Sequence, residues 1–318
     1  MGRCSPERRD GDRAGRTQGA PRALPIGATE DTAADEVGRR AKRGVAAPGA
    51  AGRHSRRVAE ASYTGSLLGV GRVAVVTGAS SGIGVEIARL LAARGDLCVL
   101  LARGAERLEA VAEELGGEAE PCDVSDRAAV DAVAERVLER HPRIDLLVNN
   151  AGIPGRTRFL DGDPEVIERL IRINYLGAVW CLRAFLPGLR AAAPSDVVNI
   201  VSVSGVVAGP PSGPYSASKH AQLAFSRTVA AELRPERIRV HTVKPGFTET
   251  EGFPQRWLPS HVQRVVIGPE DVAAHVLRSL DEGRGETTVP WYYGPIAPLQ
   301  DAMPNFFTRV LSRMPKAP

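Results

Sequence analysis

Tyr215 and Lys219 lie four positions apart in the sequence Tyr-Ser-Ala-Ser-Lys, a spacing that puts both side chains on one face of a helix. A tyrosine with an ordinary pKa near ~10 is a poor proton donor and acceptor at neutral pH. A cation about 4 Å away, at an effective dielectric constant of about 20, supplies roughly 4 kcal/mol. That free energy corresponds to about three pKa units. The pair is therefore expected to prepare Tyr215 for proton transfer near pH 7, although the same spacing also occurs on helix surfaces that have no function.

A glycine-rich turn precedes this pair in the chain. The valine-rich residues 72–77 predict a buried parallel strand, and the apolar periodicity of residues 83–91 predicts the helix that follows. Gly78 and Gly82 allow a tight turn between them, and Gly84 allows close packing of the helix on the strand. The free N–H groups at the start of such a helix attract a pyrophosphate. The alternative is an ordinary strand-to-helix turn.

The next predicted strand, residues 97–102, is followed by Arg103. A dinucleotide site that selects NAD usually carries an acidic residue at this point, where it binds the ribose 2′-hydroxyl. An arginine can instead make paired hydrogen bonds with a 2′-phosphate. Arg103 therefore favours NADP over NAD, and the alternative is a solvated surface arginine.

Together these motifs resemble those of the short-chain dehydrogenase/reductase family, in its compact single-domain branch. The similarity runs from about Arg72 to Pro290. The matching segments are the glycine turn 77–84, Asp123-Val124, Asn149-Asn150-Ala151-Gly152, Asn174, Ser202, the Tyr215/Lys219 pair, and Pro245-Gly246 with Thr250.

The resemblance implies a role for each of these residues. Tyr215 would pass a proton to or from the substrate oxygen, and Lys219 would lower its pKa and bind the nicotinamide ribose. Ser202 would hydrogen-bond the substrate carbonyl, and Asn174 would hold a water that links Lys219 to solvent. The implied cofactor contacts are Gly78, Ser80, Ser81, Gly82, Ile83, Gly84, Arg103, Asp123, Val124, Asn150, Ala151, Gly152, Tyr215, Lys219, Pro245, Gly246 and Thr250.

Some positions depart from the family pattern or allow another interpretation. Val201 stands where a second serine is common, and Ser81 stands where some NADP-using relatives carry a basic residue, which leaves Arg103 as the main candidate for the 2′-phosphate. Ser204 is an alternative to Ser202, although its spacing to Tyr215 is shorter. Asn149 and Asn150 could also be ordinary capping residues at a strand end.

The remaining elements alternate between strand and helix. Strands are predicted at 144–148, 197–203, 238–243 and 287–289, and helices at 126–140, 164–190, 214–234 and 269–282. This alternation predicts an α/β fold: a Rossmann-like, doubly wound, seven-stranded parallel sheet with helices on both faces. Ligands of such folds bind at the carboxyl ends of the strands, where Gly78, Asn150, Ser202 and Pro245 all fall.

Charge divides the chain into a tail and a domain. Residues 1–70 carry 13 Lys+Arg and 8 Asp+Glu, whereas residues 71–318 carry 28 and 29. The tail is rich in Arg, Ala and Gly and has one aromatic residue, so we expect it to be disordered. It lacks the apolar segment of a secretory signal and has too many acidic residues for a transit peptide. Its mixed charges do not favour nucleic-acid binding.

Cysteine usage and hydropathy point to the cytoplasm. Cys4, Cys98, Cys122 and Cys181 have no metal-binding spacing and indicate neither a metal site nor a disulfide framework. No stretch approaches 18 apolar residues, so no membrane span is predicted.

Two regions bear on substrate and partners. Relatives place a substrate lid at residues 247–267, and its Phe247, Phe253, Trp257, Leu258 and Val262 favour a hydrophobic substrate. In the C-terminal extension 291–318, the apolar residues after Pro304 recur at helical spacing. That short amphipathic helix could pack within the protein or its oligomer, cover the active site, or make weak contact with a membrane surface. The family often forms homodimers and homotetramers through the helices that correspond to 164–190 and 214–234.

The sequence thus predicts an NADP-dependent oxidoreductase that interconverts a hydrophobic ketone or aldehyde and the corresponding alcohol. The alternatives are an NAD-preferring alcohol dehydrogenase, an NAD(P)-binding sensor or structural protein without turnover, and an epimerase or dehydratase on the same fold.

Overall fold

A parallel sheet of seven strands forms the centre of the protein, in the order β3-β2-β1-β4-β5-β6-β7. The computed structural model describes residues 71–155, 159–160, 162–210, 212–255 and 263–313. The strands are β1 (Val73–Thr77), β2 (Leu97–Ala102), β3 (Glu118–Pro121), β4 (Leu146–Asn149), β5 (Ser195–Ile200), β6 (Ile238–Pro245) and β7 (Glu286–Val289). The predicted seven-stranded, doubly wound sheet is confirmed. The chain reverses its winding between β3 and β4, which opens a crevice beyond the ends of β1 and β4.

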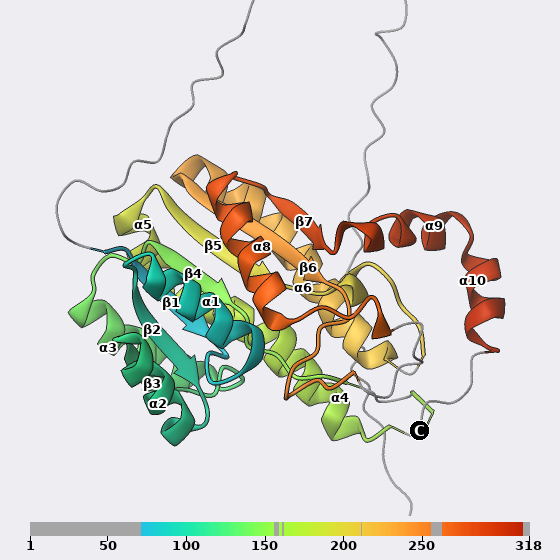
Figure 1. Cartoon of the computed structure of the whole chain (residues 1–318), viewed down its shortest axis with the longest axis horizontal. Helices are drawn as coiled ribbons and strands as arrows, with labels where there is room; N and C mark the ends of the chain where they lie inside the picture. Colours follow the sequence, from blue (N-terminus) through green and yellow to red (C-terminus); the bar gives the residue numbers. More distant parts are fainter. Residues whose placement is uncertain (1–70, 156–158, 161, 211, 256–262, 314–318) are drawn as a thin grey trace, which may run out of the picture. The chain divides into compact units, whose positions relative to one another are not determined.

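Helices cover both faces of this sheet, as a buried parallel sheet requires (Figure 1). The α-helices are α1 (Gly82–Ala93), α2 (Ala105–Leu115), α3 (Arg127–Arg140), α4 (Pro164–Ile171), α5 (Gly177–Ala192), α6 (Gly213–Leu233), α8 (Pro269–Asp281), α9 (Ile296–Ala302) and α10 (Pro304–Leu311). Shorter turns are the π-helical η1 (Arg172–Leu176) and the 3-10 turns η2 (Val203–Gly205), η3 (Arg234–Glu236) and η4 (Trp291–Tyr293).

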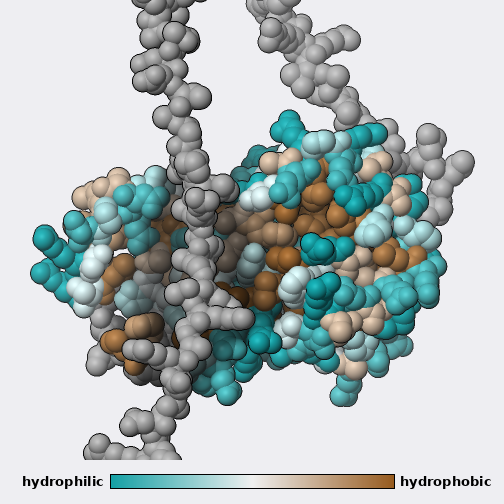
Figure 2. Space-filling view, turned by 180° about the vertical axis from the view of Figure 1, so that it is seen from behind, coloured by the Kyte–Doolittle hydropathy of each residue, from teal (hydrophilic) through white to brown (hydrophobic). Residues whose placement is uncertain are grey.

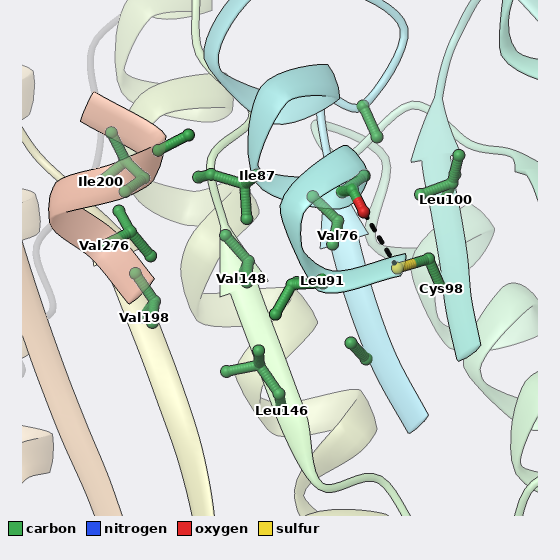
Figure 3. Packing of buried hydrophobic residues seen from close by; sticks show 14 of the residues in the cluster. Val76, Ile87, Leu91, Cys98, Leu100, Leu146, Val148, Val198, Ile200 and Val276 are labelled. Atoms are coloured by element: carbon green, nitrogen blue, oxygen red, sulfur yellow. Dashed lines mark hydrogen bonds between the residues drawn. The ribbon is translucent and has the colours of Figure 1, made fainter. Parts of the chain in front are cut away.

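Successive residues of a strand point to opposite faces of the sheet, so neighbouring valines pack in two separate hydrophobic clusters. Val76 packs with Ile87 and Leu91 of α1 and Val276 of α8 (Figure 3). Val75 instead packs in a second cluster, formed with side chains of α3, α5 and α6. The two clusters hold the helices on the two faces of the sheet. They therefore also position the loops that follow the carboxyl ends of the strands.

The predicted long helix 164–190 is interrupted. Residues 164–192 run as α4, the π-helical turn η1 and α5, with Asn174 inside the π turn. A π turn holds one residue more than an α turn and is frequent at functional sites. The asparagine that is unfavourable in an α-helix therefore sits in the one turn of this segment that departs from α geometry.

Most other boundaries differ from the prediction by one to three residues, and two of these differences fall at strands next to the site. The strand predicted at 197–203 ends at Ile200, so Ser202 follows the strand as the residue that precedes η2. The strand predicted at 144–148 begins at Leu146. The predicted elements include neither α2 nor β3. The β3 sequence, Glu-Ala-Glu-Pro, has no apolar run that would indicate a strand. Its Glu120 is instead paired with Arg136 of α3 at 2.8 Å.

The C-terminal extension forms α9 and α10, and α10 begins at Pro304. The Gln300 side chain joins α9 to the segment that follows η2: it donates to the Ala208 carbonyl at 2.7 Å and accepts from the Ala208 N–H at 3.0 Å. Among the described residues, no helix is long and apolar enough to cross a membrane. The tail 1–70 and the lid residues 256–262, with Trp257, Leu258 and Val262, lie outside the described residues.

Candidate active site

A cavity of about 370 Å³ opens at the carboxyl ends of the strands. It is lined by segments that follow β1, β2, β3, β4, β5 and β6, which are far apart in the sequence. Most predicted site residues line it: Gly78, Ser80, Ser81, Gly82, Ile83, Arg103, Asp123, Val124, Asn150, Ala151, Gly152, Ser202, Tyr215, Lys219, Pro245, Gly246 and Thr250. Gly84 and Asn174 do not line the cavity and act from behind its wall.

The glycine turn after β1 is held by the neighbouring strand end. The Asn150 side-chain amide donates to the Thr77 carbonyl at 2.9 Å and to the Gly78 carbonyl at 3.2 Å. In return, Thr77 Oγ1 accepts from the Ala151 N–H at 3.0 Å. The Asn150 side chain therefore holds the glycine turn in place, in addition to standing at the end of β4.

The glycines are required by geometry. Gly78 has φ +65° and Gly82 has φ +59°, values that residues with a side chain rarely adopt. A Cβ at Gly84 would lie 2.3 Å from the Gly78 carbonyl oxygen. The close approach brings the first turn of α1 up to the end of β1.

This arrangement fits the pyrophosphate of a dinucleotide. Ser81, the N-cap residue of α1, is in an extended conformation and its side chain makes no capping hydrogen bond. The N–H groups of the first turn are then available to an anion, which the helix dipole also favours. The small residues of the turn leave room for the anion to approach the backbone.

At the other end of the cavity, the segments after β2 and β3 offer contacts to an adenosine. Arg103 is exposed at the end of β2 and lines the cavity. Asp123 Oδ1 accepts from the Ser125 N–H at 2.9 Å and from its hydroxyl at 2.7 Å, which fixes the turn after β3. Asp123 therefore both fixes this turn and lines the cavity.

Asn174 joins three segments beneath the cavity. Its Oδ1 accepts from the Ile153 N–H at 2.8 Å, and its Nδ2 donates to the Ile153 carbonyl and to Ser218 Oγ, both at 3.1 Å. A Cβ at Gly152 would lie 3.2 Å from Asn174 Oδ1 and 3.7 Å from Lys219 Nζ. Asn174 and Lys219 therefore converge on the same point above Gly152.

Tyr215 and Ser202 meet at the opening of the cavity. Burial raises the pKa of Tyr215, and a hydrogen bond with the Ser202 side chain opposes that rise. Ser202 Oγ also accepts from the Ser204 N–H at 3.0 Å. Ser204, the alternative candidate, is part of the η2 turn and does not line the cavity.

The expected effect of Lys219 on Tyr215 is not seen. The Lys219 ammonium is buried and donates to the Ile200 carbonyl at 3.1 Å and to Gln222 Oε1 at 2.8 Å. Burial lowers the pKa of Lys219 to about 7, so its charge near neutral pH is partial. The expected lowering of the Tyr215 pKa assumes a fully charged lysine about 4 Å away. Desolvation disfavours the charged forms of both Tyr215 and Lys219 and so opposes that lowering.

Sequence reasoning missed two polar residues near the cavity. Gln222 binds Lys219, and it lies three positions beyond it on the same helix face, a spacing that would have identified it. Arg107 of α2 forms an ion pair of 2.6 Å with Glu251, which follows β6. No spacing rule connects those two residues, because they belong to distant parts of the chain.

Comparison with known proteins assigns the family. The family model for short chain dehydrogenases matches residues 72–258. The chain belongs to the short-chain dehydrogenase/reductase family. Dehydrogenase/reductase SDR family member 7B of Xenopus laevis is 34% identical over 265 residues, which cover 77% of this chain and 82% of that protein. Another curated relative, from Bos taurus, is matched over 58% of its length.

Solved structures of short-chain dehydrogenases share the fold. One from Burkholderia cenocepacia J2315, in complex with NADP, has a TM-score of 0.67 and 30% identity and covers 77% of this chain and 99% of its own. One from Burkholderia phymatum, in complex with NAD, has a TM-score of 0.66 and 27% identity, covering 78% and 98%. As a member of the family, this short-chain dehydrogenase/reductase is an oxidoreductase that acts on CH–OH groups.

Proposed function

We propose that this short-chain dehydrogenase/reductase is an NADP-dependent enzyme that interconverts an apolar ketone or aldehyde and its alcohol. The observation that carries the proposal is the meeting of Ser202, Tyr215 and Lys219 in one cavity with the glycine turn. A cofactor held at the turn and a substrate held at Tyr215 would then share that cavity.

The chain's own residues account for the proton steps. In the reducing direction, Tyr215 Oη donates its proton to the substrate oxygen, and the Ser202 hydroxyl donates a hydrogen bond to the same oxygen. A protonated Lys219 stabilises the tyrosinate that remains. When bound, the nicotinamide supplies the hydride in this direction and accepts it in the other. Ser202 Oγ accepts from the Ser204 N–H at 3.0 Å, which holds the side chain beside Tyr215, and its one O–H, which hydrogen-bonds Tyr215, would turn to the substrate oxygen when substrate binds.

The preference for NADP rests on Arg103. Its guanidinium follows β2 and lines the cavity, and no acidic residue occupies that position. A guanidinium suits a 2′-phosphate, whereas a carboxylate would repel it. Solved relatives in complex with either NADP or NAD exist, so a preference for NAD is the alternative that measurement must address.

The preference for an apolar substrate rests on the walls beside Tyr215. Phe253 lines the cavity, with its ring centroid 6.2 Å from that of Tyr215, and Ile153 and Pro154 line it as well. Apolar walls favour a hydrophobic ketone over a sugar or a charged acid, because a polar substrate would lose its hydration there.

We also propose a cytoplasmic homodimer or homotetramer built through α5 and α6. These helices carry the partly buried Trp180, Leu186 and Phe225 on the face of the sheet that they share with α3. Figure 2, the view from behind, shows apolar residues among hydrophilic ones at the surface. The exposed Trp291, Phe306 and Val310 of the C-terminal segment support weak contact with a membrane surface. Light scattering tests the oligomeric state, and sedimentation with lipid vesicles tests the membrane contact.

Oxidation of NADPH in the presence of a panel of ketones and aldehydes tests the function, with wild type compared with Tyr215→Phe. We expect turnover by the wild type and a loss of about 10²–10⁴-fold in kcat for the variant, because the proton donor is removed. NADPH binding should persist in the variant. Binding of NADPH without turnover of any carbonyl compound, in either direction, would instead support a sensor.

A further inference from the structure

We propose that Gln222 is a positioning residue of this enzyme: its side-chain oxygen holds the Lys219 ammonium in the place from which it serves the reaction. The inference rests on the proposed function and extends it to a residue outside the Ser202, Tyr215 and Lys219 set. It is carried by the geometry of α6 and of the strand end beside it.

The spacing along α6 aligns Gln222 with the site. Tyr215, Lys219 and Gln222 are four and three positions apart, so they follow one face of the helix. Ser226, four positions further, continues this face and bonds Thr242 of β6 at 2.6 Å. The buried side of α6 therefore carries polar residues where it lies against the sheet, and Gln222 stands between Lys219 and Ser226 on this face.

The hydrogen bonds of the Lys219 ammonium show how Gln222 positions it. Lys219 is 4% exposed and Gln222 is 1% exposed, and Lys219 Nζ lies 2.8 Å from Gln222 Oε1. The second acceptor is the Ile200 carbonyl at 3.1 Å, at the end of β5. An ammonium has three N–H donors, and these two fixed acceptors use two of them. The remaining donor direction is thereby set by the protein.

A buried ammonium is sensitive to such an acceptor. Burial lowers the pKa of Lys219 to about 7, so the side chain is close to half-charged near neutral pH. An oxygen that accepts from the charged form raises the pKa, and its removal lowers it. Gln222 thus favours the charged form of an amine whose burial favours the neutral form, and a charged Lys219 is what a tyrosinate at Tyr215 requires.

Other charged groups near α6 are engaged elsewhere or lie further along the cavity. Tyr215 is the titratable side chain one turn before Lys219 on the same helix. Arg103, Cys122 and Asp123 line the cavity at the ends of β2 and β3. Among the described residues of α6 and of the elements near it, the ion pairs include Arg227–Glu286, Arg172–Glu168, Arg190–Glu236, Asp196 with Arg239 and His241, and Lys244–Glu286.

Lysine NMR tests the inference directly. The chain has four lysines, Lys42, Lys219, Lys244 and Lys316, so a ¹³Cε-lysine titration of the full chain is readily resolved and Lys219→Met assigns the signal. We expect Gln222→Met, which keeps the length but removes the acceptor, to lower the Lys219 titration midpoint by about one pH unit. Gln222→Glu should raise it, because a carboxylate favours the ammonium more strongly.

Leu223→Met is the matched control, because Leu223 is a buried neighbour on α6 that supplies no polar acceptor. Its Lys219 midpoint should equal that of wild type. A midpoint that is the same in wild type, Gln222→Met and Gln222→Glu would overturn the inference. If circular dichroism shows that Gln222→Met does not fold, the higher Lys219 titration midpoint expected in Gln222→Glu still tests the inference.

Kinetics then separate positioning from general structural damage. In Gln222→Met, the pH profile of kcat for alcohol oxidation should shift to higher pH, because a less charged Lys219 stabilises the Tyr215 phenolate less. A lower kcat with an unmoved profile would contradict the positioning role. The NMR result does not depend on turnover: midpoints that move as expected in an inactive protein would retain the inference and reject the proposed function.

Discussion

At the scale of residues, burial decides the chemistry of the catalytic pair. Both Tyr215 and Lys219 have pKa values displaced toward their neutral forms, upward for the phenol and downward for the ammonium. The neutral phenol can give its proton to a substrate oxygen, whereas a neutral amine would stabilise the remaining tyrosinate less than an ammonium does. Hydrogen bonds with Ser202, Gln222 and the Ile200 carbonyl favour the charged forms of the two side chains and so oppose the effect of burial.

Arg103 offers a prediction about cofactor choice. Arg103→Ala should weaken NADPH binding by about 10–100-fold and leave NADH binding within about twofold, because a charge-assisted hydrogen bond to the 2′-phosphate contributes about 1.5–3 kcal/mol. Titration of each cofactor by fluorescence measures both affinities. Arg94→Ala is the control, since Arg94 pairs with Asp281 on the surface at 2.8 Å and does not line the cavity. Equal losses for both cofactors would reject the 2′-phosphate assignment.

At the scale of elements, the packing of α1 on β1 places the cofactor turn. Gly78, Gly84 and Asn150 come within contact distance, so the turn, the helix and the end of β4 are one unit. A second polar unit lies deeper in the sheet. Asn149 Nδ2 donates to Asn199 Oδ1 at 2.9 Å, and Asn199 Nδ2 donates to Ser226 Oγ at 2.8 Å. These contacts lock β4, β5 and α6 in register beneath the cavity.

Gly84 tests the first of these units. In Gly84→Ala, the new Cβ would lie 2.3 Å from the Gly78 carbonyl oxygen and 2.6 Å from Asn150 Nδ2, so the turn must shift. We expect a loss of about 1–3 kcal/mol in the free energy of unfolding, as for other overpacked sites. Cofactor affinity should fall as well. Urea denaturation and cofactor titration measure the two effects.

Gly104→Ala is the matched control for that substitution. No heavy atom lies within 4 Å of a Cβ placed at Gly104, which precedes α2 with φ −81°. Its stability should stay close to that of wild type. A Gly84→Ala protein as stable as Gly104→Ala, with unchanged cofactor affinity, would show that the close approach is not required.

At the scale of the whole molecule, ion pairs join the helices to the edge of the sheet. Glu286 of β7 accepts from Arg227 of α6 at 2.8 Å and from Lys244 of β6 at 2.6 Å. These hydrogen bonds lower the pKa of Glu286 to about 2. The unfolded value for glutamate is about 4.3. A lowered pKa stabilises the folded state above the unfolded value, and that contribution is lost as the pH falls toward the folded value.

Acid unfolding therefore tests Glu286. Glu286→Gln should be less stable than wild type at pH 6, and the two stabilities should converge as the pH falls from about 4.5 to 2. Urea denaturation at a series of pH values gives the difference directly. Glu282→Gln, a substitution at an exposed surface glutamate, is the comparison. A difference between wild type and Glu286→Gln that is constant over that pH range would indicate a cause other than titration of the carboxylate.

The sequence by itself determined the fold class and nearly all of the candidate site. Glycines in a turn, valine runs and the Tyr-x-x-x-Lys spacing are local signals, because strand, turn and helix geometry depend on neighbouring residues. Seventeen of the predicted residues therefore meet in one cavity, as the carboxyl ends of parallel strands require. Ser202 and Asn174 are predicted from the resemblance of their motifs to those of the family, although the structure changes the elements that carry them.

Tertiary structure alone decided the electrostatics and the long-range contacts. The lowered pKa of Lys219 arises from burial under other elements, and its Ile200 acceptor lies on a strand that precedes the helix. The Arg107–Glu251 pair joins residues far apart in the sequence. The π turn around Asn174 lies between α4 and α5, and its Asn174 side chain contacts Ile153 and Ser218 from other segments. Each depends on which segments pack together, and desolvation and contact between distant residues cannot be read from local spacing.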